Sequence, residues 1–153
     1  MIWRNSYQAL DLGSIQAPNV IGETLSGDAF ELTSPKVLFG AFDFRGASEL
    51  GVWSRLCQSE SFGISTTFAY FLSRRSREII QLAKDMTSPS LHSATVLVWE
   101  SQLWHEIIQP DRPERSFGCL IKDGVAEPIL VGTPTEEAWD YFIEKLGARM
   151  KPC

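Results

Sequence analysis

The sequence predicts a single α/β domain built around a mixed β-sheet. Two apolar runs typical of buried strands, Val37–Phe44 and Thr66–Leu72, alternate along the chain with segments of helical periodicity. Strand–helix alternation requires crossover connections and so predicts a parallel core. A length of 153 residues, 44% of them hydrophobic, is enough to bury one core. We expect one domain over residues 1–153, with its core at about 15–147 and a short tail, 148–153.

The first half of the chain predicts two strand–helix units behind an N-terminal arm. Glycine and proline recur over the first ~35 residues, which indicates an irregular arm closed by a small hairpin. The strand Val37–Phe44 follows, and then a helix capped near Ser48 that ends near 59–63. After the strand Thr66–Leu72, Ser76 is suited to cap a second helix. The apolar stripe of that helix consists of Ile79, Leu82, Ala83 and Met86.

The second half predicts a short strand, a hairpin and a last helix. A short apolar run, Ala94–Trp99, precedes a segment, Glu100–Arg115, in which two prolines indicate an irregular connection. The runs Ser116–Lys122 and Ala126–Val131 surround a turn and predict an antiparallel hairpin. Because Pro128 cannot donate a backbone hydrogen bond, its strand is expected at the edge where the sheet ends.

The last helix has the clearest terminal signals in the chain. Thr133-Pro134-Thr135-Glu136 fits a capping box with proline in the first turn, and Gly147 is expected to end the helix. From the apolar faces of all these elements, five side chains are predicted to be buried: Phe42, Phe68, Phe117, Ala138 and Phe142.

Composition excludes several classes of partner. Fourteen basic against 19 acidic residues give a net charge of −5, so neither nucleic acid nor an anionic membrane is an expected partner. No uncharged apolar run approaches the ~20 residues of a membrane span, and residues 1–6 lack the pattern of a secretion signal. We therefore expect a cytoplasmic protein.

The cysteines and histidines form no recognisable site in the sequence. Cys57, Cys119 and Cys153 are widely spaced, with no CxxC, so a disulfide framework is not expected. His92 and His105 have no cysteine or carboxylate set at zinc-ligand spacing. The sequence accordingly predicts no metal and no cofactor.

Three segments resemble the thioredoxin-like superfamily, in particular its peroxiredoxin and redoxin branch, the AhpC/TSA-like proteins. Ala17–Val20 with Leu25–Leu32 is similar to the opening hairpin of that branch, "AP-D-F … L-x-G-x-x-x-x-L". Val37–Glu49 is similar to its first core strand and the loop into the active-site helix. Arg115–Gly124, with the helix that follows, resembles its "R-x-x-F-x-I-D-x-x-G" strand and hairpin. The resemblance implies a thioredoxin-like fold over roughly residues 15–146.

The chain departs from that resemblance at the reactive cysteine. In the family, this cysteine lies in the first turn of the helix after the first core strand, where the helix dipole and free N–H groups stabilise its thiolate. The matching stretch, Phe44–Leu50, has no cysteine, and the position falls on Ser48 or Glu49. Cys57 lies nine residues beyond Ser48, near the far end of the helix, where the dipole disfavours a thiolate. Cys57 is therefore only a weak catalytic candidate.

Other residues are candidates for binding. Arg115 matches an arginine that the resemblance places beside the reactive-cysteine pocket, so it could bind an anion there with Ser48 and the helix amides. Arg45 and Glu49 could line the same mouth, although surface arginines and a solvated loop also explain them. Trp99 and Trp104, in the least regular segment, are the candidates for a partner interface, since aromatic residues are enriched at interfaces.

Three functions remain open on the sequence. The first is a redox-inactive thioredoxin-like module that binds a protein or peptide partner. The second is a thiol oxidoreductase or peroxidase that uses a relocated cysteine, Cys57 or Cys153. The third is a non-redox enzyme that handles an anionic substrate with Arg115, Arg45 and Glu49. The sequence leaves a homo-oligomer open.

Overall fold

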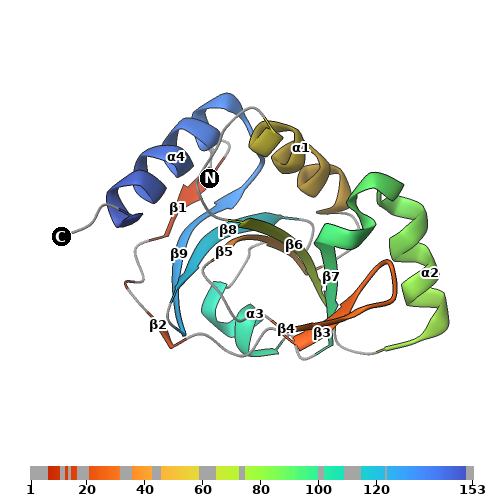
Figure 1. Ribbon diagram of the computed structural model, residues 1–153. Coiled ribbons are helices and arrows are strands. Elements are labelled where there is room, and N and C mark those ends of the chain that lie inside the picture. The colour runs from red at the N-terminus through yellow and green to blue at the C-terminus, as the bar shows by residue number, and fades with distance from the viewer. Residues whose placement is uncertain are drawn as a thin grey trace.

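A computed structural model describes residues 7–10, 13, 15–16, 21–31, 36–42, 46–58, 65–72, 75–99, 102–108, 115–122 and 124–150 (Figure 1). Its strands are β1 (Tyr7–Ala9), β2 (Ile15–Gln16), β3 (Ile21–Thr24), β4 (Ala29–Glu31), β5 (Lys36–Ala41), β6 (Ser65–Phe71), β7 (Thr95–Val98), β8 (Ser116–Lys122) and β9 (Val125–Gly132). Its helices are α1 (Ala47–Gln58), α2 (Arg77–Met86), the 3₁₀ helix η2 (Pro89–Ala94), α3 (Gln102–Ile108) and α4 (Glu136–Met150).

The described strands form one mixed sheet in the order β1-β9-β8-β5-β6-β7-β3-β4, with β2 also paired to β9. At its centre, β5 is parallel to β6 and antiparallel to β8, and Phe39 lies opposite Phe68 and Gly118. The parallel pairs β5–β6 and β6–β7 are joined by the crossover helices α1 and α2. The predicted mixed sheet with a central strand from Val37 is confirmed.

Side chains of the central strand alternate between two cores, one on each face of the sheet. Val37, Phe39 and Ala41 belong to a core that is covered by α1, α2 and α4. Leu38 points to the opposite face, where α3 supplies Trp104 and Ile108. Figure 1 shows α1 and α4 on one side of the curved sheet and α3 on the other. This double coverage explains the uninterrupted apolar run in β5, because both faces of the strand are buried.

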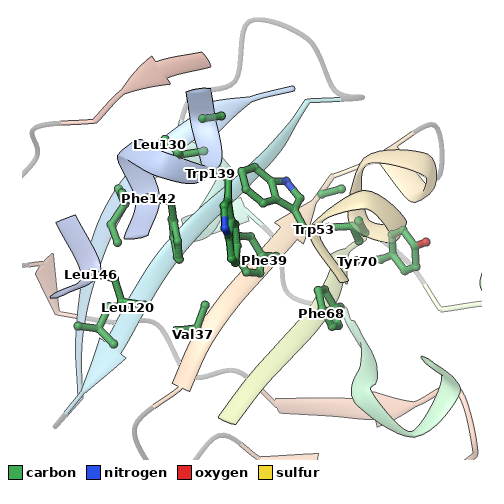
Figure 2. Packing of buried hydrophobic residues seen from close by; sticks show 14 of the residues in the cluster. Val37, Phe39, Trp53, Phe68, Tyr70, Leu120, Leu130, Trp139, Phe142 and Leu146 are labelled. Atoms are coloured by element: carbon green, nitrogen blue, oxygen red, sulfur yellow. The ribbon is translucent and has the colours of Figure 1, made fainter. Parts of the chain in front are cut away.

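Closely packed aromatic rings join α1 and α4 to the sheet (Figure 2). The Phe39 ring lies 4.7 Å from Trp53 of α1 and 4.9 Å from Phe142 of α4, centroid to centroid. All three side chains are fully buried. Their position fixes α1 relative to β5, and it thereby fixes the place where α1 begins.

The predicted helix starts are confirmed near Ser48, Ser76 and Pro134, although Ser48 is the second residue of α1 and not its cap. The hydroxyl of Ser76 caps α2 by accepting a hydrogen bond from the N–H of Ile79 at 3.1 Å. In α4 the capping hydroxyl is that of Thr135, 3.2 Å from the N–H of Ala138, rather than the predicted Thr133. Gly147 does not end α4, which continues to Met150, because a helical glycine is tolerated on an exposed face.

Four of the five side chains predicted to be buried are buried: Phe68, Phe117, Ala138 and Phe142. Phe42 lies just beyond β5, which ends at Ala41 rather than at the predicted residue 44, and it is half-buried against Phe71 and Phe117. The predicted stripe of α2 is only partly covered, since Ala83 is buried but Leu82 and Met86 are 45% and 44% exposed.

The prediction that β9 is an edge strand is wrong. Two short N-terminal strands cover its outer side: β1 pairs with Leu130–Gly132 and β2 pairs with Val125–Ala126. Pro128 falls in the gap between these two pairings, and the register against β8 shifts between Gly118 and Cys119. Neither of these two outer pairings includes Pro128, so its missing N–H interrupts neither of them.

The prediction of an irregular connection over 100–115 is corrected by α3. Within this helix Trp104 and Ile108 are one turn apart and both face the second core. The predicted N-terminal hairpin is confirmed as β3–β4, with Gly27 at a φ of 98° in its turn. In the described part of the chain, no helix is long and apolar enough to span a membrane.

Candidate functional site

The first turn of α1 lies at the carboxyl end of β5, beside the start of β8. Ala41, the last residue of β5, pairs with Ser116, the first residue of β8, and α1 begins at Ala47. Ser48 is exposed in this turn and Glu49 is half-buried. Arg45 lies outside the described residues, so its place at this mouth stays a prediction.

The carboxylate of Glu49 connects α1 to the sheet. Its Oε1 accepts hydrogen bonds from the backbone N–H of Ser116 at 2.9 Å and from the Ser116 hydroxyl at 2.7 Å. Both distances are those of well-formed hydrogen bonds from an N–H and an O–H donor. Glu49 is therefore a side chain with fixed partners rather than a solvated loop residue.

A second set of hydrogen bonds joins Glu49 to the residue that follows β9. Thr133 lies directly after β9, and its hydroxyl donates to Oε2 of Glu49 at 3.3 Å. The same hydroxyl accepts from Nη1 of Arg115 at 2.9 Å. Arg115 thus lies at the predicted mouth, and its contact with Glu49 runs through Thr133.

The centre of the cluster is buried. Ser116 is fully buried, and its hydroxyl also accepts from the indole Nε1 of Trp53 at 2.8 Å and lies 3.1 Å from the carbonyl of Gly132. A buried hydroxyl with this many partners is costly to disturb. We call Glu49, Ser116, Thr133, Arg115 and Trp53 the Glu49 cluster.

The Glu49 cluster is suited to positioning rather than to nucleophilic chemistry. The Ser116 hydroxyl has the Glu49 carboxylate as its acceptor, but Ser116 is 0% exposed, so no substrate reaches it. Neither histidine contacts the cluster: His92 lies within hydrogen-bond distance of the carbonyls of Lys84 and Thr87 at the end of α2, and His105 packs on Phe42. The Glu49 carboxylate also places a negative charge where the sequence suggested an anion site at Arg115, which opposes anion binding there.

The described cysteines lie in environments that suppress thiolate formation. Cys57 is half-buried near the end of α1, and burial raises its pKa to about 12 despite a hydrogen bond with the Thr66 side chain. Burial also raises the pKa of Cys119, which is fully enclosed in β8. Thiolate is the reactive form of cysteine, so both positions favour a packing role. Cys153 lies outside the described residues.

The two tryptophans predicted at an interface lie against the cores. Trp104 is 0% exposed and packs on Phe71 and Phe117, so it is a core residue rather than part of an exposed surface. Trp99 is half-buried against the first core. Within the described ranges, no group of three or more His, Cys, Asp and Glu side chains is placed to hold a metal ion.

Sequence reasoning missed Ser116, Thr133 and Trp53 as members of the site. Their contacts to Glu49 or to one another span 63 to 84 positions of the chain. No local pattern records such a contact. The one available signal was topological: the start of β8 must lie beside the end of β5 once the two strands pair.

No protein-family profile matches the chain, and no curated protein sequence matches it either. Solved structures do match. A SCO1/SenC family lipoprotein from Bacillus anthracis has a TM-score of 0.52 at 8% identity, covering 90% of this chain and 97% of that one. The exposed lipoprotein thioredoxin Etrx1 from Streptococcus pneumoniae has a TM-score of 0.54 at 10% identity, covering 86% and 99%.

A third similar structure is a DsbF homologue from Corynebacterium diphtheriae, with a TM-score of 0.54 at 14% identity over 93% of this chain and 94% of that one. Identities this low establish the fold and leave function open. The chain has an α/β thioredoxin-like fold with a mixed central sheet and extra N-terminal strands.

Proposed function

We propose that the chain is a redox-inactive thioredoxin-like module that binds a protein or peptide partner. One observation supports the claim that the module is redox-inactive. The first turn of α1, where the family resemblance implies a reactive cysteine, holds Glu49, whose carboxylate is hydrogen-bonded to Ser116 and Thr133. Oxidoreductase chemistry needs a stabilised thiolate at this place, and a bound carboxylate cannot replace one.

The positions of the described cysteines support the same reading. Cys57 lies over two helical turns from Ser48, at ~1.5 Å per residue, so the amides at the start of α1 cannot stabilise its thiolate. Its raised pKa, about 12, keeps the thiol protonated at neutral pH. Thiol exchange also needs a second thiol within reach, and Cys119 is enclosed in the core on the other face of the sheet.

The binding half of the proposal is supported by exposed apolar side chains. Three large hydrophobic residues of the described chain are strongly exposed: Leu82, Met86 and Leu103. Leu82 and Met86 are neighbours on α2, and paired exposed apolar residues favour a contact surface. This surface replaces Trp104 as the candidate interface.

The assignment to one branch of the thioredoxin-like superfamily and the cellular location remain predictions. We assign the chain to the AhpC/TSA-like branch on the three segments that resemble it, and we keep a cytoplasmic location as a prediction. The net charge of −5 disfavours nucleic acid and an anionic membrane as partners. Homo-oligomerisation stays open.

The test is hydroperoxide consumption by the reduced, purified protein in the presence of dithiothreitol. We expect the rate with wild type to equal that with Cys57→Ser and with buffer containing reductant alone. An enzymatic rate in wild type that Cys57→Ser abolishes would replace the proposed module with a peroxidase that uses a relocated cysteine.

A further inference from the structure

A small pocket opens between α1 and α2, away from the Glu49 cluster. It has a volume of about 70 Å³. Its lining includes apolar side chains and backbone of α1, β6 and the end of α2: Ala47, Leu50, Gly51, Phe68, Tyr70 and Met86. An engineered cavity of ~150 Å³ holds benzene, so roughly half that volume suits one aliphatic or thioether side chain.

The polar groups in this pocket already have partners. The Tyr70 hydroxyl lies 3.1 Å from the Thr87 hydroxyl. The hydroxyl of Thr95 donates to the carbonyl of Leu91 at 2.8 Å. The Ser88 hydroxyl, also in the lining, lies 3.1 Å from that of Ser90. Each of these hydroxyls is thus already engaged within the protein, so a polar group placed there would lose hydrogen bonds to water for few new ones. The pocket therefore selects an apolar occupant.

The rim on the α2 side is also apolar. Leu82 and Met86 are four residues apart, which places them on one side of the helix, and Met86 lines the pocket directly. Gly51 lies on the α1 side, where an added Cβ would meet no atom within 4 Å. A segment seated on the pocket could thus contact both rims without displacing either helix.

Charges beside this rim specify the partner further. Glu78 and Asp85 lie four residues before and three residues after Leu82, so they share its side of α2, and both are exposed. Arg77 and Lys84 project from a different side of α2. Arg55, four residues after Gly51, places a positive charge on the α1 side of the pocket. The carboxylates flank only the α2 rim, so they complement a basic segment that runs along α2 and away from Arg55.

We propose that the pocket between α1 and α2 receives an apolar side chain from a basic segment of a protein partner. The apolar anchor fills the pocket against Met86 and Gly51, and lysine or arginine residues beside it pair with Glu78 and Asp85. This inference rests on the proposed function as a binding module and names the chemistry of its partner.

The test uses a fluorescein-labelled synthetic peptide of leucine and lysine with helical spacing, titrated with full-length protein by anisotropy. Gly51→Leu should fill the pocket without harming the fold, because leucine favours helix more than glycine does. We expect Gly51→Leu to weaken binding about tenfold or more, as loss of a buried anchor does at interfaces. The matched apolar control, Leu103→Ser on α3, should bind as wild type does.

A second pair of variants tests the charges. Glu78→Gln with Asp85→Asn should weaken binding, whereas the charge-matched double variant Asp140→Asn with Glu144→Gln on α4 should not. A leucine–glutamate peptide should bind less tightly than the leucine–lysine peptide, and added salt should reduce this difference.

Three outcomes would each overturn the proposal: no binding of the leucine–lysine peptide, equal affinity for wild type and Gly51→Leu, or equal affinity for the acidic peptide. A failure here is distinguishable from failure of the proposed function, because redox turnover is measured without the peptide. Wild type that reduces peroxide contradicts the redox-inactive module, whatever its affinity for peptides.

Discussion

The carboxylate of Glu49, in the first turn of α1, accepts hydrogen bonds from both the N–H and the hydroxyl of Ser116, at the start of β8, at 2.9 and 2.7 Å. This contact links the start of the helix to the sheet across 67 positions of the chain. The contact lies in the stretch where the resemblance implies a reactive cysteine.

Glu49→Gln should lower the free energy of unfolding by about 1–3 kcal/mol, because the amide keeps one acceptor oxygen for Ser116 while its nitrogen cannot accept from the Thr133 hydroxyl. The measurement is equilibrium unfolding in urea. Glu136→Gln is the matched control, since Glu136 is also acidic and in a first turn but is exposed in α4. Equal losses of unfolding free energy in the two variants would show that Glu49 acts through the helix dipole alone and that its hydrogen bonds add no stability.

Ser48→Cys should have a thiol pKa below the usual ~8.5, because the start of α1 stabilises an anion. Gln58→Cys, exposed at the other end of α1, should have a higher pKa than Ser48→Cys, since the dipole there opposes the thiolate. The pH dependence of alkylation gives both values in a Cys153→Ser background. A Ser48→Cys pKa at or above that of Gln58→Cys contradicts the prediction.

Wild type should lose stability as the pH rises above about 9. The pKa of Cys57 is raised from 9.0 to about 12 in the folded protein. The unfolded chain therefore loses this proton first, and the free energy of unfolding decreases between these pH values. Urea unfolding at several pH values should show a smaller decrease in Cys57→Ser than in wild type. The same decrease in both proteins would mean that Cys57 is more exposed than described.

Gly40→Ala should destabilise the protein by about 1–3 kcal/mol, the usual cost of overpacking a core. A Cβ at Gly40 would lie 2.6 Å from ring atoms of both Phe117 and Phe71. Gly147→Ala is the contrasting variant: it meets no atom within 4 Å and replaces a helical glycine, so it should stabilise α4 by up to about 1 kcal/mol. Thermal unfolding of both variants distinguishes steric crowding from a general effect of removing glycine.

The sequence predicts well the parts of this fold that carry long periodic signals. β5 and β6 are recognisable because both of their faces are buried, and α2 begins at the predicted cap, Ser76. The sequence predicts poorly the short strands that form only by pairing with a neighbouring strand. β1 and β2 have three and two residues, too few for any periodicity, and they form because β9 offers a free side.

Two further differences have local physical causes. The prolines at 110 and 113 suggested an irregular segment, although Trp104, Ile107 and Ile108 have the i, i+3, i+4 spacing that identifies α3. Thr133 and Thr135 are both suited to cap α4, and the choice is made by Glu49, which engages the hydroxyl of Thr133. The position of Glu49 was readable from the sequence, whereas its hydrogen-bond partners required the paired strands.

The most direct test of the redox-inactive module is reduction of insulin disulfides in the presence of dithiothreitol, followed by turbidity with wild type, Cys57→Ser and an active thioredoxin as positive control. We expect wild type and Cys57→Ser both to match the rate of dithiothreitol alone. A wild-type rate well above that of dithiothreitol, lost in Cys57→Ser or Cys153→Ser, would contradict it and identify the relocated thiol.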